Sequence, residues 1–243
     1  MMGIMSENHH LDPHDHDHSH PDVSGGWLRA AVFGAMDGLV SNISLIAGIG
    51  AAGASNPIIV TTGVAGLVAG AFSMALGEYA SVKTQNEQVD SELQIEVDAH
   101  KRNPDGEENE LKLSFMEMGM SEKTARQAAR EVHANHDLAP RLHITHELGL
   151  DPFSKPSPWI AAVSSFAMFA AGAFIPLIPF ALGFGSLAAG LGIGAVGLLV
   201  AGALTARYTR RAWWRSALRQ LVFGAIAVVA TYSVGTLLGV RAS

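Results

Sequence analysis

The strongest constraint in this sequence is a set of long apolar stretches that carry almost no charge. A helix that crosses a bilayer needs about 20 apolar residues at 1.5 Å rise per residue. Five stretches reach that length, at residues 27–53, 58–82, 158–180, 182–206 and 217–238. Because lipid cannot hydrogen-bond the backbone, such stretches are expected to be helical, and they predict five membrane spans.

The connections between these stretches differ in length and charge. Asn56-Pro57 is expected to break the first pair of spans, and Pro176 with Pro179 the second pair. A charged segment, residues 83–157, separates the second span from the third, and its apolar periodicity predicts helices. The first of these, about 83–101, is expected to continue the second span beyond the membrane. Breaks are expected at residues 103–106, at Gly119 with Ser121 as the next N-cap, and at Pro140. The expected fold is therefore an all-α membrane protein with five transmembrane helices and a helical metal-binding domain between the second and third. The expected domains are 1–26, 27–82, 83–157 and 158–243.

Arginines and tryptophans predict the orientation. Loops rich in Lys and Arg stay in the cytoplasm, and Trp gathers at membrane interfaces. The connection between the last two spans holds Arg207, Arg210, Arg211, Arg215 and Arg219. The tryptophans Trp27, Trp159, Trp213 and Trp214 fall at the same predicted side. We therefore expect a multi-pass protein of the cell (inner) membrane, with the N-terminus and charged segment in the cytoplasm and the C-terminus outside.

Two acidic residues, Asp37 and Glu78, lie within the predicted spans. An ionised acid deep in a bilayer costs about 2.5–3.5 kcal/mol even on lenient insertion scales, so it normally has a function. Arg29 lies at the membrane edge, and we expect no Lys or Arg to be deep enough to pair with either acid. A passing cation is then the expected counter-charge.

The neighbours of these acids suggest a pathway. Asp37 and Ser41 share one helix face with Asn42 beside it, and Met74 and Glu78 are one turn apart on the second span. We expect a polar seam between the two helices that carries a metal ion. For Met74 the alternative is ordinary packing, and for Glu78 it is a snorkelling or capping role.

The charged segment contains side chains spaced to meet on one helix face. The candidate metal ligands there are Glu92, Glu96, Glu107, Glu110, Met116, His143, His146 and Glu147. Carboxylate, imidazole and thioether together suit Fe²⁺, Mn²⁺, Co²⁺ or Zn²⁺ better than Mg²⁺ or Ca²⁺. The alternative is a solvated acidic face.

Several function classes are excluded or disfavoured. The chain has no cysteine, so disulfides and thiolate sites are excluded, and its net charge of −6 argues against nucleic acid as a partner. Residues 143–147, HITHE, do not match the H-E-x-x-H order of zinc proteases, so we do not expect an enzyme. The N-terminal tail holds His9, His10, His14, His16, His18 and His20, a composition that favours loose metal capture.

Three motifs carry a family resemblance: FGAMDGLVSN, GLVAGAFSMALGEYASVKTQNE and HELGLD. They resemble the vacuolar iron transporter family over most of residues 27–240. The resemblance implies five spans, a homodimer, a cytoplasmic metal-binding domain and export of Fe²⁺, often with Mn²⁺, in exchange for protons. It marks Asp37 and Met74 as the membrane pathway with Glu78 beside them. It also marks five glutamates of the charged segment as ligands that capture the metal: Glu92, Glu96, Glu107, Glu110 and Glu147.

The sequence departs from the family pattern in two places. Met36 stands where the family commonly has Asn, and His143 and His146 stand where it often carries Met. An imidazole in place of a thioether changes metal preference, so the preferred ion stays open between iron, manganese, cobalt and zinc.

The expected function is a divalent-metal transporter that moves Fe²⁺, and Mn²⁺ as a second ion, out of the cytoplasm in antiport with protons. The ions are cargo, so no permanently bound cofactor is expected, and the expected partners are membrane lipid and a second copy of the chain. The alternative is a non-transporting membrane metal sensor or buffer, which would not need Asp37 deep in the bilayer.

Overall fold

The computed structural model describes residues 26–183, 185–209 and 212–242, and within them every regular element is helical. Five helices in this part of the chain are long and apolar enough to cross a membrane: Trp27–Ala51, Asn56–Arg102, Pro158–Ala181, Leu187–Ala206 and Trp213–Gly239. The expected all-α membrane fold is confirmed. The histidine-rich tail lies outside the described residues.

The first span, α1 (Trp27–Ala51), turns into α2 (Asn56–Arg102) where the sequence predicts a break. Gly53 has φ 85°, a left-handed conformation that glycine adopts without steric cost. Pro57 lies in the first turn of α2, where its missing N–H breaks no helical hydrogen bond. The proline therefore begins the second helix.

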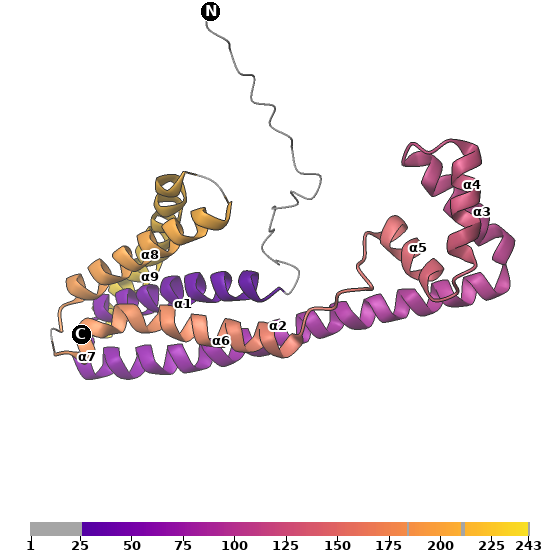
Figure 1. Ribbon diagram of the computed structural model, residues 1–243. Helices are drawn as coiled ribbons and strands as arrows, with labels where there is room; N and C mark the ends of the chain where they lie inside the picture. The colour runs from indigo at the N-terminus through magenta and orange to yellow at the C-terminus, as the bar shows by residue number, and fades with distance from the viewer. Residues whose placement is uncertain (1–25, 184, 210–211, 243) are drawn as a thin grey trace, which may run out of the picture.

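Helix α2 contains 47 residues and continues well beyond the membrane, as predicted for residues 83–101. At 1.5 Å per residue it is about 70 Å long, more than twice the bilayer core. Figure 1 shows it as one rod, with the other spans along one part and the helices of the charged segment along the other. A continuous helix thus joins the two parts of the molecule.

The third span, Pro158–Ala181, ends within one residue of the predicted end at 180. After α6 (Pro158–Phe174) the chain continues through a 3₁₀ turn, Ile175–Leu177, into α7 (Ile178–Ala181). The α-helix α6 thus ends just before Pro176, as a proline break predicts, but Pro176 and Pro179 lie inside the following helical turns and the connection to the next span begins only after Ala181. Each occupies a first-turn position, where proline is tolerated. The helix ends before Gly183, at φ 82°, and α8 (Leu187–Thr209) begins five residues later than predicted.

Helix α1 is the central element of the membrane part. It packs on α6 at glycines, because a Cβ atom at Gly38 would overlap the carbonyl oxygen of Phe169, and one at Gly172 that of Ala35. On another face it meets the last helix, α9 (Trp213–Ala242), where Gly235 lies against the backbone of Gly48. Small residues of this kind allow the close helix contacts that drive association in lipid.

The charged segment folds into three short helices beside the end of α2: α3 (Pro104–Glu117), α4 (Glu122–His133) and α5 (Leu138–Leu148). The predicted N-cap at Ser121 is present, and its hydroxyl accepts a hydrogen bond from the Thr124 N–H. Pro140 was expected to interrupt a helix, but it lies in the first turn of α5. A small core joins the three helices: Leu111, Ala129 and Ala139, with Phe115, Val132 and Leu142 around it.

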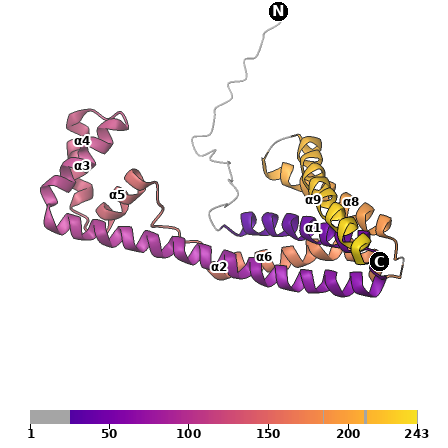
Figure 2. The same ribbon diagram turned by 180° about the vertical axis from the view of Figure 1, so that it is seen from behind.

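The chain returns to the membrane along the side of α2, as both views show (Figures 1 and 2). Asn86 donates a hydrogen bond to the carbonyl of Pro156 at 3.0 Å, and Lys155 forms an ion pair with Asp90. Arg141 of α5 donates to the carbonyl of Pro152 at 3.0 Å. These contacts hold α5 against the extension of α2, and this places their side chains face to face.

Candidate metal centre

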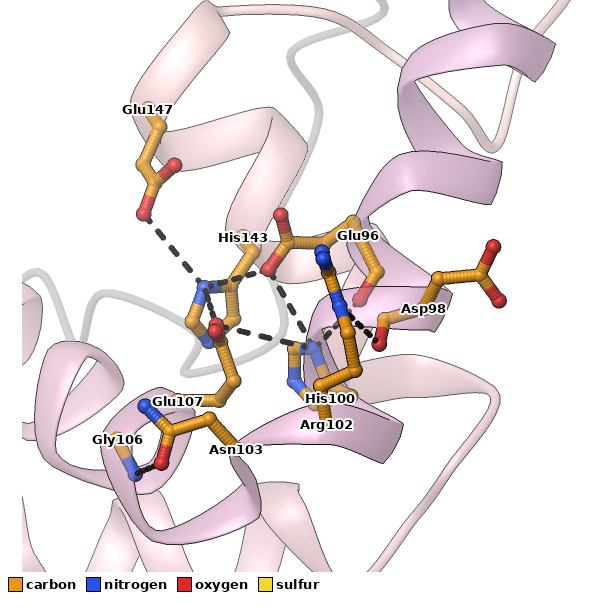
Figure 3. A network of polar contacts seen from close by, with 9 residues as sticks. All are labelled: Glu96, Asp98, His100, Arg102, Asn103, Gly106, Glu107, His143 and Glu147. Atoms are coloured by element: carbon orange, nitrogen blue, oxygen red, sulfur yellow. Dashed lines mark hydrogen bonds and ion pairs between the residues drawn. The ribbon is translucent and has the colours of Figure 1, made fainter.

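Four side chains from three helices converge between α2, α3 and α5. Glu96 and His100 come from α2, Glu107 from the first turn of α3, and His143 from α5. One ligand atom from each lies within 4.8 Å of all the others. Figure 3 shows these side chains pointing toward one another. We call this set the four-residue centre.

His143 lies at its middle. Its Nδ1 atom is 3.1 Å from Glu96 Oε1 and 3.6 Å from Glu107 Oε2. It is also 3.5 Å from Glu147 Oε1, one turn further along α5. The side chain is only 1% exposed, so its contacts are all with protein. A second group of potential ligands shares this histidine: Glu110, His143 and Glu147.

Burial and crowding raise the proton affinity of the carboxylates. Burial raises the pKa of Glu96 to about 7, and the negative charge of Glu107 adds to the shift. Burial also raises the pKa of Glu147, and the negative charge of Glu110 raises it further. Carboxylates held this close favour either a shared proton or a bound cation.

The imidazoles shift in the opposite direction. Burial lowers the pKa of His143 to about 4, and the neighbouring His100 lowers it further. The pKa of His100 is also lowered, again mainly by burial. Both rings are therefore neutral at pH 7, which is the form that binds metal. Neutral imidazoles and crowded carboxylates together form a donor set for a divalent cation.

Two histidines near this centre were missed by the sequence analysis. His100 follows Glu96 by four residues, a spacing that could have revealed it. His133 ends α4, and its ring stacks on His100 with centroids 5.4 Å apart. No local spacing connects His133 to the other ligands, because only the packing of α4 brings it there.

Three predicted ligands lie outside the groups described above. Glu92 is half-buried one turn before Glu96 on α2. His146 is exposed on α5, although it is only three residues from His143. Met116 is 37% exposed near the end of α3, two turns from Glu110. Spacing along one helix therefore grouped residues that the packing of three helices separates.

One expectation about the membrane acids was wrong. Arg29 Nη2 donates to Glu78 Oε2 at 2.8 Å, so Glu78 has a protein counter-charge. The Glu78 side chain is 9% exposed and that of Arg29 is 66% exposed. A long arginine stem lets a residue at the helix start reach a partner deeper in the bundle. Ala30, Val82 and Ala161 form a buried cluster that joins α1, α2 and α6.

The other pathway candidates do not form one seam between α1 and α2. Asp37 is exposed on the surface of the helix bundle, and its Oδ1 accepts a hydrogen bond from Ser41 at 3.1 Å. Asn42 is buried on another face and donates to the carbonyl of Ala173 in α6 at 2.5 Å. Met74 of α2 packs against the buried cluster formed by Ala71 of its own helix with Phe169 and Ala173 of α6. Helix α6 thus takes the place that the predicted seam would occupy.

Residues 28–236 match the VIT family. A vacuolar iron transporter of Acanthamoeba castellanii is 35% identical over 222 residues, covering 88% of this chain and 79% of that protein. Vacuolar iron transporter homolog 1 of Oryza sativa subsp. japonica is 35% identical over 221 residues, covering 88% and 75%. Vacuolar iron transporter 1 of Eucalyptus grandis is 28% identical over 238 residues, covering 96% and 93%.

Proposed function

Because this chain belongs to the VIT family, we propose that it carries Fe²⁺, with Mn²⁺ as a second ion, out of the cytoplasm in exchange for protons. The relatives are named as vacuolar iron transporters, and the chain is a transporter rather than an enzyme.

The observation that carries the proposal is that two ligands of the four-residue centre, Glu96 and His100, lie on α2, the helix that also forms the second membrane span. The donor atoms of the centre, two carboxylates and two neutral imidazoles, suit Fe²⁺ and its neighbours in the first transition series. Helix α2 runs without a break from Glu96 back to Glu78 and Met74. An ion captured at the centre is therefore collected beside the helix that leads into the bilayer.

Within the membrane, we propose that the ion passes Glu78 and then Asp37 with Met74. Asp37 is exposed on the bundle surface, and a charge facing lipid at that depth is costly. A second copy of the chain covering this surface would shield Asp37 and Ser41 from lipid. We therefore propose a homodimer in which the Asp37 face of α1 is turned toward the partner.

Proton exchange follows from the chemistry of the ligands. A carboxylate binds either a proton or a metal ion, so the two compete for one site. The raised pKa of Glu96, about 7, lets that exchange occur near neutral pH. We propose that the charged segment faces the cytoplasm, in agreement with the arginines between the last two spans.

The test is transport by the purified protein in liposomes, with Fe²⁺ flux and proton flux recorded together. Asp37→Asn is expected to reduce Fe²⁺ flux to background, because the amide keeps the size of the side chain and loses its charge. Glu117→Gln, which removes an exposed carboxylate of α3, is the control and should transport normally.

Normal iron flux through Asp37→Asn would contradict the proposed pathway. Binding of metal by the unaltered protein without any flux would instead support the alternative, a membrane metal sensor or buffer. Iron flux without opposite proton movement would leave transport standing and reject the antiport.

A further inference from the structure

His100 offers the four-residue centre a second imidazole, from a different helix than the first. Its side chain is 10% exposed, and its Nδ1 atom lies 3.4 Å from Glu96 Oε1 and 3.9 Å from Glu107 Oε2. Its ring meets that of His143 edge to face, with centroids 4.7 Å apart. Both Nδ1 atoms thus face the same pair of carboxylate oxygens.

The spacing of these atoms already matches a metal site. A tetrahedral ion with ligands at about 2.1 Å holds neighbouring ligand atoms about 3.4 Å apart. The separations between the imidazole nitrogens and the carboxylate oxygens are 3.1, 3.4, 3.6 and 3.9 Å. Small side-chain movements would therefore be enough to close the set around an ion.

The hydrogen bonds of His100 define its state without metal. Nδ1 lies 3.1 Å from the carbonyl oxygen of Glu96, which can only accept, so Nδ1 carries the proton. Nε2 is buried and has no hydrogen-bond partner among the described residues. Moving the proton from Nδ1 to Nε2 of the neutral ring frees the Nδ1 lone pair for a metal and leaves the charge of the ring unchanged.

His133 holds the His100 ring in place. The two rings lie nearly parallel, at an interplanar angle of 20°. Three helices therefore bring imidazoles to this region: His100 from α2, His133 from α4 and His143 from α5. His133 does not belong to the set of converging ligand atoms, so its contribution is the stacked contact.

We propose that His100 is the second imidazole ligand of the four-residue centre and sets its metal preference, and that His133 positions the His100 ring. Two imidazoles with two carboxylates favour Zn²⁺, Co²⁺ and Fe²⁺ over Mn²⁺, because imidazole raises affinity for the later ions while carboxylates alone suit Mn²⁺, Mg²⁺ and Ca²⁺. The inference rests on the proposed function in one respect: it assumes that the transported ion is selected at this centre.

The experiment measures binding on the full chain in detergent, independently of transport. Every sample has the six tail histidines of residues 9–20 replaced by glutamine, so that the tail does not bind the added ions. Competition titrations give the ratio of Co²⁺ to Mn²⁺ affinity. Pulsed EPR of bound Mn²⁺ counts the coordinated imidazole nitrogens directly.

His100→Asn is expected to lower the Co²⁺ to Mn²⁺ affinity ratio about tenfold or more, and to reduce the coordinated imidazoles from two to one. His133→Ala is expected to weaken Co²⁺ binding about tenfold, as loss of an outer-shell partner does. His133→Phe keeps a stacking ring and should bind nearly as the parent does. His146→Asn, on an exposed position of α5, is the matched control and should change neither reading.

A parent protein with only one coordinated imidazole would overturn the ligand role of His100, whether or not the His100 variant folds. An unchanged affinity ratio in a folded His100→Asn protein would do the same. If His133→Phe binds as weakly as His133→Ala, stacking is not the contribution of His133. If the binding results are as expected but the protein carries no iron flux, the proposed transport is rejected and this inference stands.

Discussion

At the scale of single residues, two side chains in contact shift their proton affinities in opposite directions. The pKa of Glu96 rises to about 7 and that of His143 falls to about 4, in each case first because of burial. Near neutral pH the metal-free centre therefore holds its proton on a carboxylate and leaves the imidazole free. The proton, and not a charged histidine, is what a metal ion must displace.

Metal affinity is therefore expected to fall as the pH is lowered. Below pH 7 Glu96 is protonated, and a metal must release that proton, so affinity is expected to fall by up to about tenfold per pH unit from pH 7 to 6. Above the pKa the carboxylate is already ionised and this dependence should flatten by pH 8. His143 does not compete in this range because its pKa is about 4. Competition titration with Co²⁺ at each pH is the measurement.

Glu96→Gln removes the titrating group and is the control. It should bind Co²⁺ more weakly at pH 8 and lose the steep part of the curve. A parent protein whose affinity stays constant between pH 6 and 7 would show that Glu96 is not the group exchanged for metal.

The Arg29–Glu78 pair supports a second prediction at this scale. Removing one partner leaves the other charge without its counter-ion, so Arg29→Gln and Glu78→Gln are each expected to lower thermal stability. The double variant should be less destabilised than the sum of the two. Because Arg29 is mostly exposed, the coupling energy is expected to be only about 1 kcal/mol.

The measurement is a double-mutant cycle by thermal unfolding in detergent. Strictly additive losses would mean that the 2.8 Å contact contributes nothing to stability. Lys83→Gln with Glu87→Gln, an exposed pair on α2 with N and O atoms 3.7 Å apart, serves as the comparison and should show a smaller coupling.

At the scale of elements, the contact of α1 with α6 determines the packing of the membrane part. The two helices approach so closely that a methyl group at Gly172 would overlap the carbonyl oxygen of Ala35. Asp37 and Ser41 lie on a face of α1 that α6 does not cover. The exposure of Asp37 is one consequence of this contact.

Gly172→Ala is expected to destabilise the protein by about 1–3 kcal/mol, because the added methyl group pushes two backbones apart. Gly192→Ala on α8 is the matched control, since a Cβ atom there would meet nothing within 4 Å. The control should be neutral or slightly stabilising. Thermal unfolding of the two variants tests this, and equal stability would show that α1 and α6 separate at little cost.

At the scale of the whole molecule, α2 and the irregular segment 149–157 that returns beside it join two parts of opposite character (Figure 2). One part is a bundle of apolar helices, and the other is a small helical domain that carries the four-residue centre. Asn86 and Asp90 anchor the returning chain to α2 between them. Movement of the ligand-bearing helices relative to the bundle is therefore restricted at this point.

The sequence by itself determined the five spans, the extension of α2 to about residue 101 and the N-cap at Ser121. These features depend on hydropathy, periodicity and capping over a few turns of helix, and neighbouring residues contain that information. Asp37, Glu96, Glu107 and His143 could be selected as candidates on the same basis. The end of the third span was also predicted to within one residue, but the turn to the next span lies after Ala181 and not at Pro176 and Pro179, because a proline is tolerated in the first turn of a helix.

Only the tertiary structure decided which side chains meet. Arg29 and Glu78 are 49 residues apart, and His133 reaches His100 from another helix. These contacts depend on where the glycines let α1, α2 and α6 approach one another. They also depend on how the core of the charged segment positions α4. The direction in which a side chain points is set by the rotation of its helix against its neighbours. That rotation is a property of the packed molecule, and no single stretch of the sequence contains it.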